Sequence, residues 1–181
     1  MDPRFRGDKL WIPAQGRNDR KMDFLTNSAE ETKAAAKKII IKLLKRPHPG
    51  ALVLALAGEL GAGKTTFVQG LAKALGIKEK ILSPTFVILK RYGVRPLGRD
   101  KGSPAEAGTP MNFYHLDCYR IQSAKDLAGL GFEKILKNKN NLVVIEWAER
   151  VKTILPADTV WIEFKHGGED ERRIKILNFK D

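Results

Sequence analysis

The stretch "GELGAGKTTF", residues 58–67, contains the phosphate-loop pattern G-x-x-x-x-G-K-[ST]. The fixed positions of this pattern are Gly58, Gly63, Lys64 and Thr65. The apolar run ALVLALA at 51–57 comes directly before the loop and is typical of a strand buried on both faces of a parallel sheet. A helical apolar pattern over 65–75 comes directly after it. The order of strand, glycine loop and helix predicts that the chain binds a nucleoside triphosphate.

The residue types in this loop suit a polyphosphate. Glycines let backbone N–H groups turn toward phosphate oxygens, and the N-terminus of the following helix adds a favourable dipole. Lys64 can reach the β- and γ-phosphates as a point charge. Thr65 offers a hydroxyl for Mg²⁺, and Thr66 can support it. We therefore expect ATP and Mg²⁺ as the cofactors.

The rest of the chain alternates between strand and helix patterns. Near the N-terminus it predicts a short strand at 24–25 and a helix from a Ser28–Glu31 capping box to 44. Further along it predicts strands at 85–92, 112–119 and 141–147, with one or two short helices within 123–136 that are broken near Gly129 and Gly131. The last predicted element is a hairpin of 159–165 with 172–179. This order predicts an α/β protein with a P-loop NTPase fold. Its central sheet should be mostly parallel and flanked by helices, with a C-terminal antiparallel hairpin.

The composition of the 181 residues favours a soluble globular protein, because 43% are hydrophobic and 30% are charged. Residues 1–21 have no helical or strand period and predict a disordered basic extension. Residues 22–181 predict one P-loop ATPase domain, with an irregular insertion at about 93–110 that is rich in Gly, Pro and charge. Much of the net charge of +12 falls in the extension and the insertion, so we interpret it mainly as solvated charge.

The chain has neither a signal-peptide core nor an apolar run of membrane-spanning length. The single cysteine, Cys118, suits a reducing compartment, and we expect a cytoplasmic protein without membrane or DNA partners.

Two carboxylates end apolar strand patterns in the way that metal and catalytic residues do in α/β proteins. Ligands bind outside the carboxyl ends of the strands in such sheets. Glu146 follows the apolar run 142–145, and Asp117 ends the pattern HLD. One of them can hold Mg²⁺, directly or through water, while the other orients the attacking water. The division of these roles stays open at this point.

Aromatic and imidazole side chains accompany both carboxylates. His115 shares a strand face with Asp117, although a lone histidine is commonly structural, and Cys118 points to the opposite face. Trp147 follows Glu146 directly, and it either stacks on a partner or a base, or packs in the core.

Four motifs in one order resemble the TsaE family, the bacterial ATPases of tRNA threonylcarbamoyladenosine synthesis. They are GELGAGKTTF, SPTF at 83–86, HLDCYR at 115–120 and IEWAER at 145–150. The resemblance covers roughly residues 24–179. It implies weak ATP hydrolysis that supports a complex of TsaD and TsaB, which places threonylcarbamoyl on the adenosine beside the anticodon of tRNAs that read codons beginning with A. Contact with tRNA is then indirect.

The resemblance also implies roles for individual residues. The nucleotide-binding set is Glu59, Leu60, Gly61, Ala62, Gly63, Lys64, Thr65 and Thr66, with an arginine of the C-terminal hairpin that is either Arg172 or Arg173. Thr65 and Glu146 match the Mg²⁺ positions of the family, and Lys64, Asp117 and Glu146 are the catalytic candidates. The switch-like segment is Ser83, Pro84, Thr85 and Phe86, and the candidates for site support or partner contact are His115, Tyr119, Arg120 and Trp147.

Two other functional classes compete with a pathway ATPase. A small-molecule kinase shares the phosphate loop, but segment 93–110 lacks the helical period of an arginine-bearing lid. A direct RNA-binding module would use the basic segments, but no RNA-recognition pattern with interleaved aromatic residues is evident.

Overall fold

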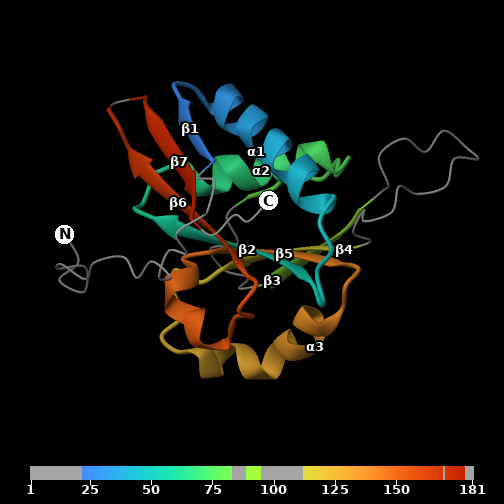
Figure 1. Cartoon of the computed structure of the whole chain (residues 1–181). Coiled ribbons are helices and arrows are strands. Elements are labelled where there is room, and N and C mark those ends of the chain that lie inside the picture. The colour runs from blue at the N-terminus through green and yellow to red at the C-terminus, as the bar shows by residue number, and fades with distance from the viewer. Residues whose placement is uncertain (1–21, 83–88, 95–111, 169, 178–181) are drawn as a thin grey trace, which may run out of the picture.

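The computed structural model describes residues 22–82, 89–94, 112–168 and 170–177, in which seven strands form one sheet (Figure 1). The order across the sheet is β1-β7-β6-β2-β5-β4-β3. The strands are β1 (Asp23–Thr26), β2 (Leu52–Gly58), β3 (Leu89–Gly93), β4 (Asn112–Asp117), β5 (Asn141–Glu146), β6 (Val160–His166) and β7 (Arg172–Ile176).

The centre of the sheet is parallel and its edges are antiparallel. β2 pairs in parallel with β5 and β6, and β4 pairs in parallel with β5. The edge pairs β6–β7, β1–β7 and β3–β4 are antiparallel. The predicted α/β fold with a parallel centre and a C-terminal hairpin is therefore confirmed, while the strand order and the antiparallel pairs β1–β7 and β3–β4 come from the structure alone.

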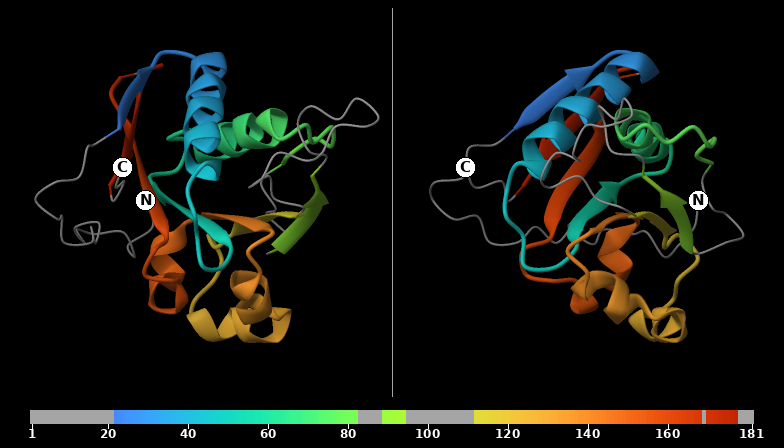
Figure 2. Two further views of the ribbon diagram at one scale, coloured as in Figure 1. Left: turned by 45° about the vertical axis from the view of Figure 1, so that its right-hand side comes forward. Right: turned by 90° about the vertical axis from the view of Figure 1, so that its right-hand side faces the viewer.

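Helices cover both faces of this sheet (Figures 1 and 2). The long helices α1 (Ala29–Leu44) and α2 (Lys64–Ala74) lie together on one face. The short helices η2 (Ala124–Leu130), α3 (Phe132–Lys137) and η3 (Ala148–Ile154) lie on the other. None of the described helices is long and apolar enough to span a bilayer.

The start of α1 follows from the predicted cap. The Ser28 hydroxyl accepts the N–H of Glu31 at 3.1 Å, as in a capping box. The Glu31 carboxylate accepts the N–H of Asn27 at 2.7 Å, one residue before the expected position. The first bond satisfies an N–H group that the first helical turn leaves without a partner, and the second ties the residue before the cap to the same turn.

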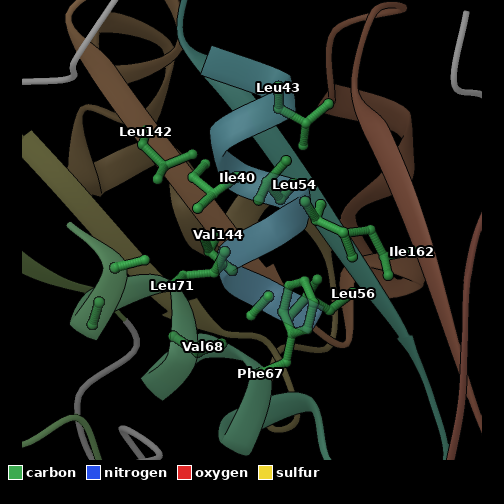
Figure 3. Close-up of a cluster of buried hydrophobic side chains, with 14 of the residues drawn as sticks. Ile40, Leu43, Leu54, Leu56, Phe67, Val68, Leu71, Leu142, Val144 and Ile162 are labelled. Carbon is green, nitrogen blue, oxygen red and sulfur yellow. The ribbon is translucent and has the colours of Figure 1, made fainter. Parts of the chain in front are cut away.

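The larger of two buried clusters joins α1 and α2 to the parallel strands (Figure 3). Its labelled side chains in Figure 3 are Ile40, Leu43, Leu54, Leu56, Phe67, Val68, Leu71, Leu142, Val144 and Ile162. The second cluster lies between the opposite sheet face and the short helices, and it includes Cys118, Ile145 and Trp147. Alternate residues of β5 thus enter opposite clusters, which explains why its positions 142–145 are all apolar.

Gly70 lets α1 and α2 approach closely, and Gly70→Ala should destabilise the fold. An added Cβ would lie 2.6 Å from Lys33 Cα and 2.8 Å from Lys33 O, so the α1 backbone would have to shift. Overpacking of this kind costs about 1–3 kcal/mol, and we expect thermal unfolding to begin about 4–10 °C lower. Gly129→Ala is the control, because no described atom lies within 4 Å of the added methyl there. Equal melting curves for both variants would contradict this account of the helix pair.

Several predicted boundaries differ from the structure. β4 ends at Asp117 rather than 119, because the chain turns as the Asp117 carboxylate accepts the N–H of Tyr119 at 2.9 Å. The break between the short helices lies at Gly131, which has φ 65°, and not at Gly129, which lies within η2. Helix η3 was not predicted. The extension 1–21, the start of the strand predicted at 85–92, most of the insertion at 93–110 and the segment Ser83–Phe86 lie outside the described residues, and those predictions stay untested.

Candidate functional site

Three parallel strands bring the phosphate loop and both carboxylates to one edge of the sheet. In the β2–β5 register Leu56 lies opposite Glu146, and in the β4–β5 register Asp117 lies opposite Glu146. The loop begins two residues after Leu56, at Gly58. Because all three strands run in the same direction, their carboxyl ends form a single candidate site.

The turn from the loop into α2 depends on backbone conformation and not on a capping side chain. Gly63 is the N-cap of α2 and has φ 95°, a left-handed conformation that favours glycine. No side chain caps this helix end, so its first N–H groups face the loop. A helix N-terminus built in this way binds anions.

Lys64 is buried although it carries a charge. Its Nζ donates to the carbonyls of Gly58 and Glu59, both at 2.7 Å, and lies 3.9 Å from the ring centroid of Trp147. Burial lowers the pKa of Lys64, while the negative charges of Glu146, Glu149, Asp117 and Glu59 act in the opposite direction. The ammonium is therefore held at the loop by carbonyl dipoles, an aromatic face and surrounding carboxylates.

Glu146 is the most enclosed carboxylate of the site, with 2% of its surface exposed. The hydroxyl of Thr65 donates to its two oxygens at 2.9 and 3.1 Å, and the Nε2 of His115 lies 2.9 Å from Oε1. Hydroxyl and carboxylate oxygens are ligands that Mg²⁺ prefers. The described residues hold no cluster of three or more His, Cys, Asp or Glu side chains that could bind a metal alone.

Asp117 lies opposite Glu146 but has a more open position. It is half-buried, and its Oδ1 accepts the backbone N–H of Tyr119 at 2.9 Å. This bond fixes the turn after β4 and directs the carboxylate by local geometry rather than by burial.

Trp147 packs in the core and also contacts the site. It is 7% exposed, belongs to the second buried cluster and lies with its ring centroid 5.0 Å from that of Tyr119. Its φ of 58° is left-handed, an uncommon conformation for a bulky residue that is typical of functional sites. Trp147 is the N-cap of η3, so this helix begins at Ala148, two residues after Glu146. The core interpretation of Trp147 thus fits the structure, with a contact to Lys64 in addition.

Most of this chain is similar to one known protein family. The family model described as "Threonylcarbamoyl adenosine biosynthesis protein TsaE" matches residues 26–174. The chain belongs to the TsaE family. It is 36% identical over 157 residues to the tRNA threonylcarbamoyladenosine biosynthesis protein TsaE of Bacillus subtilis, with 86% of this chain and 84% of the relative covered. It is also 36% identical to the protein of the same name from Treponema pallidum, with 86% and 99% covered.

A solved structure supports the same assignment to the TsaE family. The crystal structure of YdiB from Bacillus subtilis matches with a TM-score of 0.62 and 32% identity. The match covers 89% of this chain and 87% of YdiB.

Within this TsaE-family fold, the two hairpin arginines have different surroundings. Arg173 forms a bidentate ion pair with Asp23 of β1, with its Nε 3.0 Å from both carboxylate oxygens and its Nη2 2.6 Å from Oδ2. Arg172 instead packs against the loop, where a Cβ on Gly63 would lie 2.9 Å from its Cδ. Its Nη1 donates to Asp170 O at 2.9 Å, and its buried Nε has no hydrogen-bond partner among the described residues. Of the two hairpin arginines, Arg172 is therefore the one that lies beside the phosphate loop.

The remaining residues of the TsaE loop and motifs are placed as follows. Glu59, Leu60 and Gly61 are exposed at the loop tip, Ala62 is buried, Thr66 is half-buried in the first turn of α2, and Arg120 is exposed after β4. Cys118 is buried, and burial raises the pKa of its thiol to about 12, so it fits a core role.

Glu149 is a partly buried carboxylate near Lys64 that the sequence interpretation did not include among the candidate site residues. Burial raises the pKa of its carboxyl, and the charge of Lys64 acts on it in the opposite direction. In the described part of the chain its Oε2 is buried without a hydrogen-bond partner. The available signal was its position three residues after Glu146, in the first turn of a helix that the sequence pattern did not predict.

Proposed function

We propose that this chain is the ATP-binding and ATP-hydrolysing component of the machinery that installs threonylcarbamoyl on the adenosine next to the anticodon of tRNAs reading codons that begin with A. It acts in the cytoplasm through a complex of TsaD and TsaB, and reaches tRNA only through that complex. The observation that carries this proposal is the contact of Thr65, at the start of α2, with the buried Glu146 at the end of β5. It occurs in a chain whose curated relatives are named for this modification.

Each residue of the site has a defined task in ATP hydrolysis. Backbone N–H groups of the loop and the N-terminus of α2 bind the phosphates, with Lys64 as the cation and Arg172 beside Gly63. Thr65 and Glu146 would hold Mg²⁺, which when bound neutralises charge on the phosphate oxygens. Asp117, beside Glu146 and more open, orients the attacking water.

Reconstitution with TsaD, TsaB, tRNA and threonylcarbamoyl-adenylate tests this proposal. We expect repeated rounds of tRNA modification to require this chain together with ATP and Mg²⁺. Equal multiple-turnover modification without the chain would refute the pathway assignment. When ATP carries a label in its γ-phosphate, the label should appear in inorganic phosphate. Its transfer to a metabolite would instead identify a kinase.

Substitution of the two hairpin arginines should have different effects on ATP affinity. Arg172→Gln should weaken ATP binding by about 10- to 100-fold, because a charge-assisted hydrogen bond contributes about 1.5–3 kcal/mol. Arg173→Gln breaks an exposed ion pair with Asp23, which typically contributes about 0–1 kcal/mol, and should leave nucleotide affinity unchanged. Isothermal titration with ATP and Mg²⁺ measures both variants. The reverse ranking would assign the nucleotide contact to Arg173.

A further inference from the structure

His115 makes a buried contact with the proposed metal ligand that no part of the mechanism above uses. It lies on β4 opposite Val144 of β5, and its ring extends along the same sheet face to Glu146, two residues further. The Nε2 to Oε1 distance is 2.9 Å, and the two side chains are 0% and 3% exposed. The contact therefore joins two neighbouring strands at the edge where the site lies.

The chemistry of this contact fixes the position of the imidazole hydrogen. An ionised carboxylate only accepts hydrogen bonds, so Nε2 must be the donor. Nδ1 is buried and has no hydrogen-bond partner among the described residues. A hydrogen on Nδ1 would be a buried donor without an acceptor, which is costly. Nε2 as the donor to the Glu146 carboxylate fits both conditions.

We propose that His115 is a positioning residue, which holds the Glu146 carboxylate in the orientation that binds Mg²⁺ with Thr65. This inference rests on the proposed function. The terminal torsion of a glutamate is broad, so one hydroxyl contact leaves the carboxylate free to rotate. The donor from His115 engages Oε1, while the Thr65 hydroxyl lies closest to Oε2, at 2.9 Å. Together they fix the plane of the carboxylate before any metal binds.

A merely structural role makes a different prediction from a positioning role. Loss of a buried hydrogen bond lowers stability wherever it occurs in the sheet. Loss of a group that orients a metal ligand weakens metal binding, typically by 10- to 100-fold. Metal affinity and fold stability must therefore be measured separately on matched variants.

Three variants of His115 separate these roles. His115→Leu removes the donor, His115→Asn carries an amide too short to reach Oε1, and His115→Gln places an N–H close to the original Nε2. Asn141→Leu is the matched control, because Asn141 is buried at the other end of β5 and bonds Ile135 O and Asn112 Nδ2, each at 2.9 Å. It removes two partly buried hydrogen bonds, one to β4 and one to α3, at the end of β5 away from Glu146.

The probe is a fluorescent ATP analogue, titrated with Mg²⁺ and also bound in EDTA, with thermal melting of each variant. We expect His115→Leu and His115→Asn to need about 10- to 100-fold more Mg²⁺ for half-maximal enhancement of binding. Their binding in EDTA should equal that of the wild type. His115→Gln should return the Mg²⁺ requirement to within a few-fold of wild type, and Asn141→Leu should lower only the melting temperature.

Several results would overturn the inference. One is a wild-type Mg²⁺ requirement in whichever of His115→Leu and His115→Asn folds. Another is a Mg²⁺ requirement in His115→Gln that stays as high as in those variants. A third is an equal rise of the Mg²⁺ requirement in Asn141→Leu. A wild-type protein that binds the analogue identically with Mg²⁺ and with EDTA would instead remove the metal site from the proposed function, and this inference with it. The results on the variants leave ATP and Mg²⁺ binding by the wild type intact, so they contradict this inference without contradicting the proposed function.

Discussion

Lys64→Met should abolish productive ATP binding while the protein stays folded. The ammonium at the loop is the one cation that the phosphate pattern places against the β- and γ-phosphates. Its removal from an enclosed site should reduce hydrolysis by about 100-fold or more. The fold should tolerate the change, because the lowered pKa of Lys64 means that folding disfavours its charged form. Methionine removes the buried charge and leaves a flexible apolar side chain over the Trp147 ring.

Two measurements check this expectation. Thermal melting without nucleotide should place the unfolding midpoint within about 5 °C of wild type, while calorimetric titration with ATP and Mg²⁺ should show no saturable binding. Lys64→Arg is the matched control, since it keeps the charge but replaces the compact ammonium by a planar group. We expect it to lose activity as well. Unchanged turnover in Lys64→Met would refute the site.

The strands and helices that position the loop could be predicted from local sequence patterns. The fully buried strand β2, the capped helix α1 and the β6–β7 hairpin each have a characteristic period of apolar residues or a clear boundary signal. Helix η3 was missed because it is a short helix that begins directly at a strand end, after a tryptophan in a left-handed conformation. Sequence patterns seldom indicate such a reversal, because tertiary packing imposes it.

The members of the site could be predicted better than their contacts. Strand ends indicated Asp117 and Glu146, but adjacency depends on strand order, which local periodicity does not determine. The register that puts Asp117 opposite Glu146 also brings His115 to Glu146. In the same way, the choice between two adjacent arginines required the knowledge that β1 supplies Asp23 to Arg173. These are pairings between distant segments, and the folded sheet creates them.

Glu146→Gln should reduce Mg²⁺-dependent hydrolysis by about 100-fold or more, because it removes the buried negative charge that faces the metal position. Glutamine has nearly the same shape but only one acceptor oxygen, so it keeps the bond from Thr65 or the bond from His115 and not both, and we expect a loss of stability of about 1–3 kcal/mol. The measurement is phosphate release over a range of Mg²⁺ concentrations, together with ATP binding in EDTA. The affinity in EDTA should stay close to wild type, since the loop and Lys64 are intact. A wild-type rate at low Mg²⁺ would remove Glu146 from the site.

Asp117→Asn is the comparison that separates the roles of the two carboxylates. Asparagine retains an oxygen that can accept the N–H of Tyr119, so the turn after β4 should be preserved. If Asp117 orients the attacking water, its variant should hydrolyse ATP slowly at every Mg²⁺ concentration, with an unchanged Mg²⁺ midpoint. The Glu146→Gln variant should instead need more Mg²⁺. A shifted midpoint in Asp117→Asn and none in Glu146→Gln would exchange the two roles. The burial of Glu146 against the Thr65 hydroxyl, beside the more open Asp117, is the physical reason to expect the first result.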